Sequence, residues 1–235
     1  KDTRNGLLGT DFSTKLSAWL ALGCITARQV HGQMVKFEDG AKEVEKSWTK
    51  AAGYGKGENK GTAAVRFELL WRDYMRLCVR KFGPKTFHVS GFRDVGEDQK
   101  KWKYVDGHRK DGTGDPTKTR EVFERFLFGQ TGTGFIDASQ RELFLTGYTS
   151  NRTRQNVASY LSKHLGIDWR LGAEWYECLL VDYDVANNWG NWQYVAGVGN
   201  DPRQGRTFNP VKQALDYDTS GEYTKAWVPE LRPID

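Results

Sequence analysis

Apolar residues recur every three or four positions along most of the chain, which is the spacing of amphipathic helices. The clearest pattern lies in residues 62–83, where one apolar stripe consists of Ala63, Phe67, Leu70, Trp71, Tyr74, Leu77 and Cys78. Gly83 and Pro84 follow the stripe, and both residue types are common just past a helix end. The pattern predicts one long amphipathic helix that ends at about Gly83.

Helices are also predicted on both sides of this segment. Before it, residues 13–22 are rich in helix formers, and Thr26 is placed to cap a second helix that continues to about Phe37. After it, Gly147 and Gly166 stand at two predicted helix ends. The helices expected in the second half cover residues 119–128, 135–145 and 151–165, and a fourth begins near Asp168.

Two segments, about residues 49–61 and 87–118, show no periodicity and are rich in glycine and charged residues. We expect both to form mobile loops. No segment shows the alternation that is typical of a half-buried strand, and the sequence contains no internal repeat. The sequence therefore predicts an all-α fold, with one bundle-like domain over residues 1–235.

Composition argues against a disordered protein and against a membrane protein. Hydrophobic residues make 38% of the chain and charged residues 28%, and no apolar run reaches the ~18 residues of a membrane span. Cys24, Cys78 and Cys178 are far apart and odd in number, which indicates reduced thiols in an intracellular protein. The net charge of +5 allows polyanion binding without requiring it. We expect a monomer with no metal site and no membrane contact.

One predicted helix carries a polar face. Asn151, Arg154 and Gln155 are spaced to share that face, beside an apolar stripe that includes Val157 and Leu161. The spacing fits either the polar wall of a cavity or an ordinary solvated helix surface.

Acidic residues stand at two further positions where they could bind a ligand. Glu68 and Arg72 are four residues apart with Trp71 beside them, which fits either a surface ion pair or a carboxylate and an indole that face a flat heteroaromatic ligand. Asp182 and Asp184 do not share a helix face, so we expect them at a helix end, where they can accept hydrogen bonds.

Hydrolytic and phosphate-binding motifs are absent from the sequence, and the aromatic content is unusual, with nine tryptophans. Residues 181–194, VDYDVANNWGNWQY, resemble the flavin-contacting segment of the photolyase/cryptochrome family, and NWGNW resembles its DASH branch. The stretches TDFSTKLSAWLALG, FELLWRDYMR, TGYTSNRTRQNVASYL, IDWRLGAEWYE and GVGNDPRQGRTFNPVKQALDYD resemble further family motifs in the family's order. The resemblance covers nearly the whole chain except the two irregular segments.

The resemblance implies that the domain binds FAD. The residues that match the diphosphate-binding stretch are Ser13, Thr14, Lys15, Leu16 and Ser17, where hydroxyls, amides and one ammonium suit an anion. The residues that match the flavin pocket are Asn151, Arg154, Asp182, Asp184 and Asn188, with Arg154 and Asp182 expected as an ion pair and Asn188 facing flavin N5. The resemblance also implies a preceding α/β antenna domain, with an antenna chromophore such as a folate whose site is not on this chain.

The resemblance also implies a role in electron transfer for three of the tryptophans. Trp192 and Trp169 match the first two members of the family's electron-transfer chain, and Trp102 is the candidate third member. Without the motif context, core packing would be the ordinary role for all three indoles.

A further group of residues matches positions that contact damaged DNA in the family. This group consists of Glu68, Trp71, Arg72, Asn151, Gln155, Tyr194 and Gln213. Members specific for the (6-4) photoproduct carry histidines where Asn151 and Gln155 stand, so the resemblance implies cyclobutane pyrimidine dimers as the substrate. Tyr194 replaces a larger indole, and a weaker platform favours single-stranded DNA, because extruding a dimer from a duplex costs more.

The sequence therefore predicts light-driven repair of pyrimidine dimers by electron transfer from reduced FAD. Glu68 would hydrogen-bond the dimer carbonyls, and Trp71 would stack on the bases. RNA remains an alternative partner. A light receptor that signals without repair is an alternative function, and a catalytically silent nucleic-acid-binding protein is a third.

Overall fold

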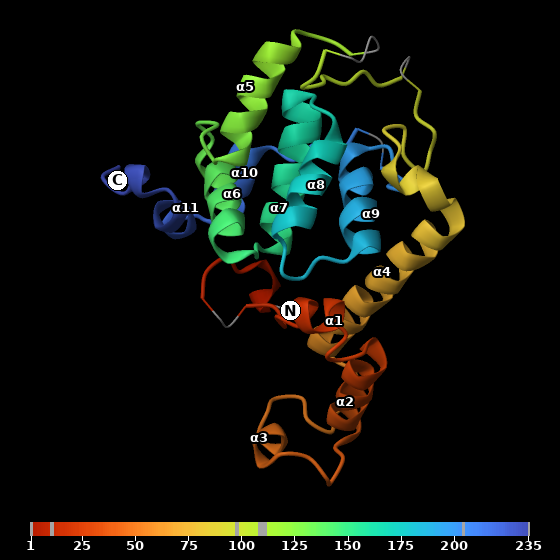
Figure 1. Ribbon diagram of the computed structural model, residues 1–235. Helices are drawn as coiled ribbons and strands as arrows, with labels where there is room; N and C mark the ends of the chain where they lie inside the picture. Colours follow the sequence, from red (N-terminus) through yellow and green to blue (C-terminus); the bar gives the residue numbers. More distant parts are fainter. Residues whose placement is uncertain (1, 10–11, 97–98, 108–111, 204, 235) are drawn as a thin grey trace.

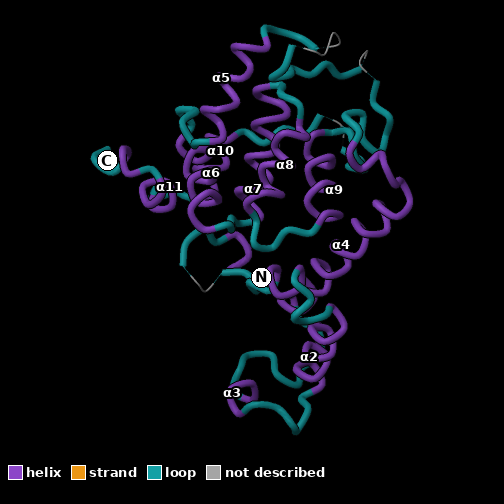
Figure 2. The backbone as a smooth tube through the Cα atoms, in the orientation of Figure 1, coloured by secondary structure: helices purple, strands orange, loops and turns teal. Residues whose placement is uncertain are grey.

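The computed structural model describes residues 2–9, 12–96, 99–107, 112–203 and 205–234, which form helices and loops without a strand in these ranges (Figure 2). The α-helices are α1 (Ser17–Ala21), α2 (Ala27–Asp39), α3 (Lys46–Thr49), α4 (Lys60–Phe82), α5 (Pro116–Leu127), α6 (Gly134–Thr146), α7 (Asn151–Ser159), α8 (Trp169–Leu179), α9 (Val185–Ala196), α10 (Pro210–Tyr217) and α11 (Glu222–Trp227). Short 3₁₀ helices occur at Asp2–Asn5, Gly83–Phe87 and Pro229–Leu231, and a π-helix at Tyr160–Leu165 extends α7. The predicted all-α fold is confirmed.

The second half of the chain forms the bundle (Figure 1). Helix α6 packs against α7 and α11, and α8 packs against α9. Helix α4 lies across α9, while α2 and α3 extend away from the bundle at the bottom of Figure 1. A large apolar core lies between α7, α8 and α9, and its fully buried members include Val157, Leu161 and Trp169.

Helix α4 buries only part of the stripe that its sequence suggests. Phe67, Leu70 and Leu77 are each more than half exposed, and of the predicted stripe only Cys78 is buried, together with Leu69 and Met75 from outside it. Apolar residues occur on more than one side of this helix, so the spacing alone does not select the side that meets α9.

The predicted helix over residues 13–22 is wrong in its first part. Ser13 and Lys15 have φ angles of 55° and 54°, which lie in the left-handed region, so the backbone turns there and α1 starts only at Ser17. The following helix is as predicted, because Thr26 and Gln29 form a capping box at its start. Helix α5 begins three residues earlier than expected, since the Asp115 side chain caps it.

Both irregular segments contribute to packing. In the first, the ring of Tyr54 packs edge-on against Phe37 of α2, with centroids 5.6 Å apart. In the second, Trp102 and Tyr104 are buried in the core, and the backbone N–H of Lys103 donates to the oxygen of Gly166 at 2.8 Å.

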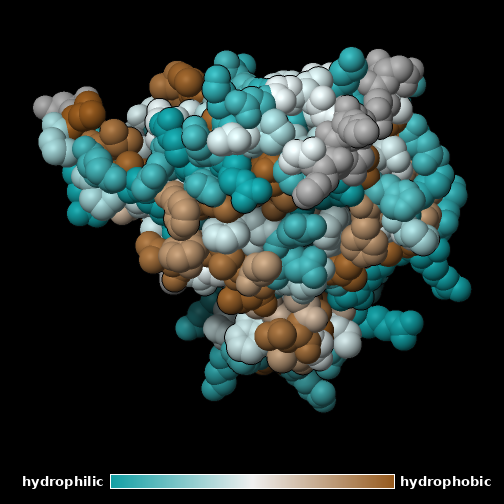
Figure 3. All heavy atoms as spheres, turned by 45° about the horizontal axis from the view of Figure 1, so that its top comes forward, coloured by the Kyte–Doolittle hydropathy of each residue, from teal (hydrophilic) through white to brown (hydrophobic). Residues whose placement is uncertain are grey.

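The described ranges contain no helix whose length and hydropathy would suffice to cross a membrane. The face drawn in Figure 3 mixes polar and apolar side chains, with apolar clusters in its lower half.

Candidate flavin site

A cavity of about 680 Å³ lies between α4, the loop before α1, and the ends of α7, α8 and α9 that face them. Its walls contain most of the predicted site residues: Ser13, Thr14, Lys15, Leu16, Ser17, Glu68, Trp71, Arg72, Asn151, Arg154, Gln155, Asp182, Asp184, Asn188, Trp192 and Tyr194. These residues come from segments that are far apart in the sequence. The polar face of α7 is therefore a cavity wall and not a solvated helix surface.

An ion pair lies in the cavity wall, as predicted. Nη2 of Arg154 donates to Oδ2 of Asp182 at 2.9 Å, and Nε of Arg154 donates to the backbone oxygen of Thr149 at 2.9 Å. The Asp182 side chain is 2% exposed and the Arg154 side chain is 27% exposed, toward the cavity. Burial lowers the pKa of Arg154, but the attraction of Asp182 outweighs it and raises the pKa, so the guanidinium stays charged.

Two fully buried side-chain oxygens of this wall have no hydrogen-bond partner among the described residues. They are Oδ1 of Asp182 and the hydroxyl of Tyr176. Burial raises the pKa of Tyr176, so the hydroxyl keeps its proton. Because buried polar groups are normally satisfied, this wall is suited to a ligand that brings its own N–H and C=O groups.

Asp184 and Asn188 are held in place at the start of α9. Asp184 caps the helix by accepting from the backbone N–H of Asn187 at 3.0 Å, and its Oδ2 accepts from Arg76 at 2.5 Å. Burial raises the pKa of Asp184, but the hydrogen bonds from Arg76 and Asn187 outweigh it, and the pKa is lowered. The Asn188 amide donates to the backbone oxygen of Ala173 at 2.8 Å, which fixes its orientation at the cavity.

Lys15 occupies the turn before α1. Its Nζ lies 3.4 Å from the centroid of the Phe12 ring and 4.2 Å from that of Tyr148. Burial lowers the pKa of Lys15, and Glu142 partly offsets this effect. Ser13 and Thr14 line the same cavity as Lys15, and two hydroxyls with one ammonium suit a diphosphate.

An aromatic platform forms another part of the wall. The indole Nε1 of Trp71 donates to Oδ1 of Asn191 at 3.0 Å, and the Trp71 ring meets the Tyr194 ring edge-on with centroids 5.3 Å apart. The Tyr194 hydroxyl accepts from Arg203 at 2.8 Å. Both rings are therefore fixed at the cavity.

Glu68 does not form the i,i+4 ion pair with Arg72, which was one of the two interpretations of their spacing. Its carboxylate pairs with Arg4, from the first 3₁₀ helix, while Arg72 reaches Asp73 and the backbone oxygen of Leu20. Sequence spacing indicated only a local partner, and the structure supplies one from the start of the chain.

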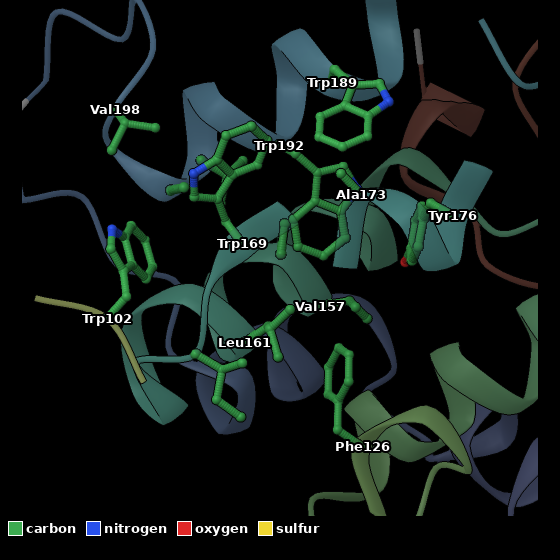
Figure 4. Packing of buried hydrophobic residues seen from close by; sticks show 14 of the residues in the cluster. Trp102, Phe126, Val157, Leu161, Trp169, Ala173, Tyr176, Trp189, Trp192 and Val198 are labelled. Carbon is green, nitrogen blue, oxygen red and sulfur yellow. The ribbon is translucent and has the colours of Figure 1, made fainter. Parts of the chain in front are cut away.

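The three predicted electron-transfer indoles and Gln213 lie in different places, and the three indoles are drawn in Figure 4. Trp192 lines the cavity and also packs edge-on against Tyr176, with ring centroids 5.2 Å apart. Trp169 and Trp102 lie in the core behind the cavity and do not line it. Gln213, on α10, lies outside the cavity and accepts a hydrogen bond from Asn156 at 3.4 Å.

The sequence of this chain is similar to those of known flavin-binding proteins. A family model described as "FAD binding domain of DNA photolyase" matches residues 65–235. The chain belongs to the DNA photolyase and cryptochrome family. A relative named "Putative cryptochrome DASH, mitochondrial", from Neurospora crassa, is 61% identical over the whole chain.

Two solved structures of the family share the fold. A cryptochrome from Synechocystis sp. PCC6803 gives a TM-score of 0.80 at 43% identity, and it covers 99% of this chain. A class III photolyase from Agrobacterium tumefaciens gives a TM-score of 0.75 at 30% identity, over the whole chain. The chain spans 32% of the Neurospora relative and 42% of each solved chain.

As in this family, the domain binds FAD, and the residues present fit that cofactor. Lys15 and its neighbouring hydroxyls would hold the diphosphate, while Arg154, Asp182 and Asn188 would hold the flavin end. The unpartnered Oδ1 of Asp182 is a ready acceptor for a ring N–H. When bound, the flavin supplies light absorption and one-electron chemistry, and the protein supplies orientation and electrostatics.

Sequence reasoning missed several residues at the cavity. These are Arg4, Phe12, Tyr148, Tyr176, Asn191, Asp201, Arg203, Arg206 and Phe208. Tyr148 lies three residues before Asn151, and Tyr176 lies in the helix predicted to begin near Asp168, so a closer inspection of these two stretches would have found both. Arg4 and Arg203 carry no local signal, because only the fold brings them to the cavity.

Proposed function

We propose that this protein uses blue light to repair cyclobutane pyrimidine dimers in single-stranded DNA, with reduced FAD as the electron donor. The observation that carries the proposal is the cavity in which Glu68, Trp71 and Tyr194 stand on the same walls as the predicted flavin residues. A dimer placed there would have an acidic group and two aromatic rings beside it, within the same cavity as the flavin.

Each residue has a separate part in this proposal. The rings of Trp71 and Tyr194 stack on the extruded pyrimidines, since base–aromatic stacking depends little on base identity. Glu68 hydrogen-bonds the dimer, and this requires it to leave Arg4, with which it pairs at a half-exposed position. Asn188, held by Ala173, presents an amide that can donate or accept but cannot ionise.

The preference for pyrimidine dimers in single strands rests on three residues. Asn151 and Gln155, which line the cavity, are neutral amides at positions where (6-4)-specific members carry histidines. Tyr194 offers a smaller stacking surface than an indole, so less binding energy is available to extrude a dimer from a duplex. RNA that carries the same lesion is the second candidate substrate class for this platform.

A light receptor is the second candidate. Such a protein needs the same FAD site and the same indoles, and the relatives of this chain are named cryptochromes. The retention of Glu68 and Trp71 on the cavity wall favours repair, because a receptor has no use for groups that contact a dimer.

Repair of a thymine dimer in a single-stranded oligonucleotide, measured under blue light with FAD-loaded and reduced protein, tests the proposal. We expect Glu68→Ala to slow repair by about tenfold or more, through loss of a transition-state hydrogen bond. The matched control is Glu58→Ala. Glu58 is also an exposed glutamate that pairs with an arginine, Arg66, but it lies outside the cavity. Equal repair rates in the parent and Glu68→Ala would refute the role of Glu68.

A further inference from the structure

Trp189, on α9, is a buried indole that has no part in the proposal above. Its side chain is 5% exposed, and its ring meets the Trp169 ring edge-on, with centroids 5.7 Å apart and planes at 80°. Trp102 lies on the other side of the cluster in Figure 4, with Trp169 and Trp192 between the two. Trp102 and Trp189 are therefore both placed to be the last indole oxidised in the cluster.

Opposite charges stand beside these two indoles. Nζ of Lys100 lies 4.3 Å from the centroid of the Trp102 ring, whereas Nε1 of Trp189 donates to Oε2 of Glu177 at 2.8 Å. Removal of an electron leaves an indole positively charged, so an ammonium over its ring opposes oxidation and a carboxylate at its nitrogen favours it. The charges favour oxidation of Trp189 over oxidation of Trp102.

The hydrogen-bond partners also differ in what they can do with a proton. Nε1 of Trp169 donates to the backbone oxygen of Val89 at 3.1 Å, and an amide oxygen is too weak a base to take the proton of an oxidised indole. A carboxylate, the group that Glu177 offers to Trp189, is a stronger base than an amide oxygen. Glu177 is exposed, so it can pass the proton on to water. An oxidised Trp189 can therefore lose its proton and persist as a neutral radical.

We infer that Trp189 is the terminal electron donor of this indole chain and that Glu177 receives its proton. The inference rests on FAD binding at the cavity, because the oxidant that it requires is light-excited oxidised flavin, and it goes beyond the proposed repair, which uses reduced FAD. It replaces the sequence-based assignment of Trp102 to the last position.

The step balances in electrons and protons. Trp169 first loses one electron to oxidised Trp192. Trp189 then gives one electron to oxidised Trp169, so Trp169 becomes neutral again. The Nε1–H bond of oxidised Trp189 then breaks, its electron pair stays on nitrogen, and the proton binds Oε2 of Glu177. The products are a neutral indolyl radical and a neutral carboxylic acid.

Time-resolved absorption of the FAD-loaded protein after a blue flash tests the inference, because cationic and neutral indole radicals absorb at different visible wavelengths. Trp189→Phe should lower the yield of the neutral radical by about tenfold, whereas Trp102→Phe should change it by less than about twofold. Trp48→Phe is the control for removal of an indole, since Trp48 packs against Phe37 away from the bundle.

Glu177→Gln provides a second test at an exposed position that leaves the core unchanged. Glutamine keeps an oxygen that can accept the indole hydrogen bond but cannot take the proton, so the cationic radical should replace the neutral one and decay faster. An unchanged neutral-radical yield in Trp189→Phe, with FAD content equal to that of the parent, would overturn the inference. A parent that binds FAD but forms no indole radical would overturn the inference as well, while leaving the proposed repair by reduced FAD untouched.

Discussion

The ion pair between Arg154 and Asp182 gives the sharpest prediction about the cofactor. Asp182→Asn keeps the shape of the side chain but removes its charge. Oδ2 of Asp182 is the acceptor for Arg154 at 2.9 Å, and Oδ1 is the unpartnered acceptor at the cavity. The substitution therefore weakens one contact within the protein and one contact available to FAD.

The expected loss follows from the type of contact. A hydrogen bond to a charged group contributes about 1.5–3 kcal/mol, so FAD affinity should fall by about 10- to 100-fold. Breaking a buried ion pair costs about 3–5 kcal/mol, but Arg154 is 27% exposed, so solvent offsets part of that cost. We therefore expect the apoprotein to lose about 2 kcal/mol of unfolding free energy.

Titration of free FAD, followed by flavin fluorescence at fixed ionic strength, measures the affinity, and urea unfolding measures the stability. Asp94→Asn is the matched control, because Asp94 is 60% exposed and pairs with Lys85, and neither residue lines the cavity. If Asp182→Asn bound FAD within about twofold of the parent, the assignment of Asp182 as a flavin residue would be wrong, since that difference is worth well under 1 kcal/mol.

Three further predictions concern groups around the cavity. Burial raises the pKa of Glu142, which accepts from Thr149 and Tyr223 at 2.7 Å each, so the parent should lose stability as pH rises above about 4.5. Unfolding of Glu142→Gln across that range should show a flatter pH dependence, and an equally steep one would exclude Glu142 as the cause. Burial lowers the pKa of Lys100 to about 8, so its charge destabilises the fold below that value and the cost disappears between pH 8 and 10.5. Lys100→Met should therefore raise the melting temperature more at pH 7 than at pH 10, and the reverse order would contradict the assigned cause. A β-carbon on Gly172 would lie 2.3 Å from the Trp192 ring, so Gly172→Ala should cost about 1–2 kcal/mol in urea unfolding, after the helix propensity of alanine is counted. No loss would mean that Trp192 is packed less tightly than the structure places it.

The polar residues of the site could be predicted because motif and helix spacing act locally. The spacing of Asn151, Arg154 and Gln155 puts them on one face, and Asp184 lies at a helix start because its side chain caps that helix. The resemblance to the family then added the partner of Arg154, which spacing alone could not supply.

The errors arose where the fold overrides local pattern. Ser13 and Lys15 adopt left-handed backbone angles in a sequence of helix formers, and nothing in the residue types signals that turn. Helix α4 has apolar residues on several sides, so its periodicity identified the helix but not the side that packs on α9. The pairing of Arg4 with Glu68 joins residues 64 positions apart, which no local rule predicts.

Light-dependent repair of a thymine dimer in a single-stranded oligonucleotide, counted per bound and reduced FAD, tests the central claim most directly. The account predicts many dimers repaired per flavin in blue light, none in the dark, and slower repair in duplex DNA. Stoichiometric FAD that is photoreduced in the protein without any repair would contradict the account and would favour a light receptor.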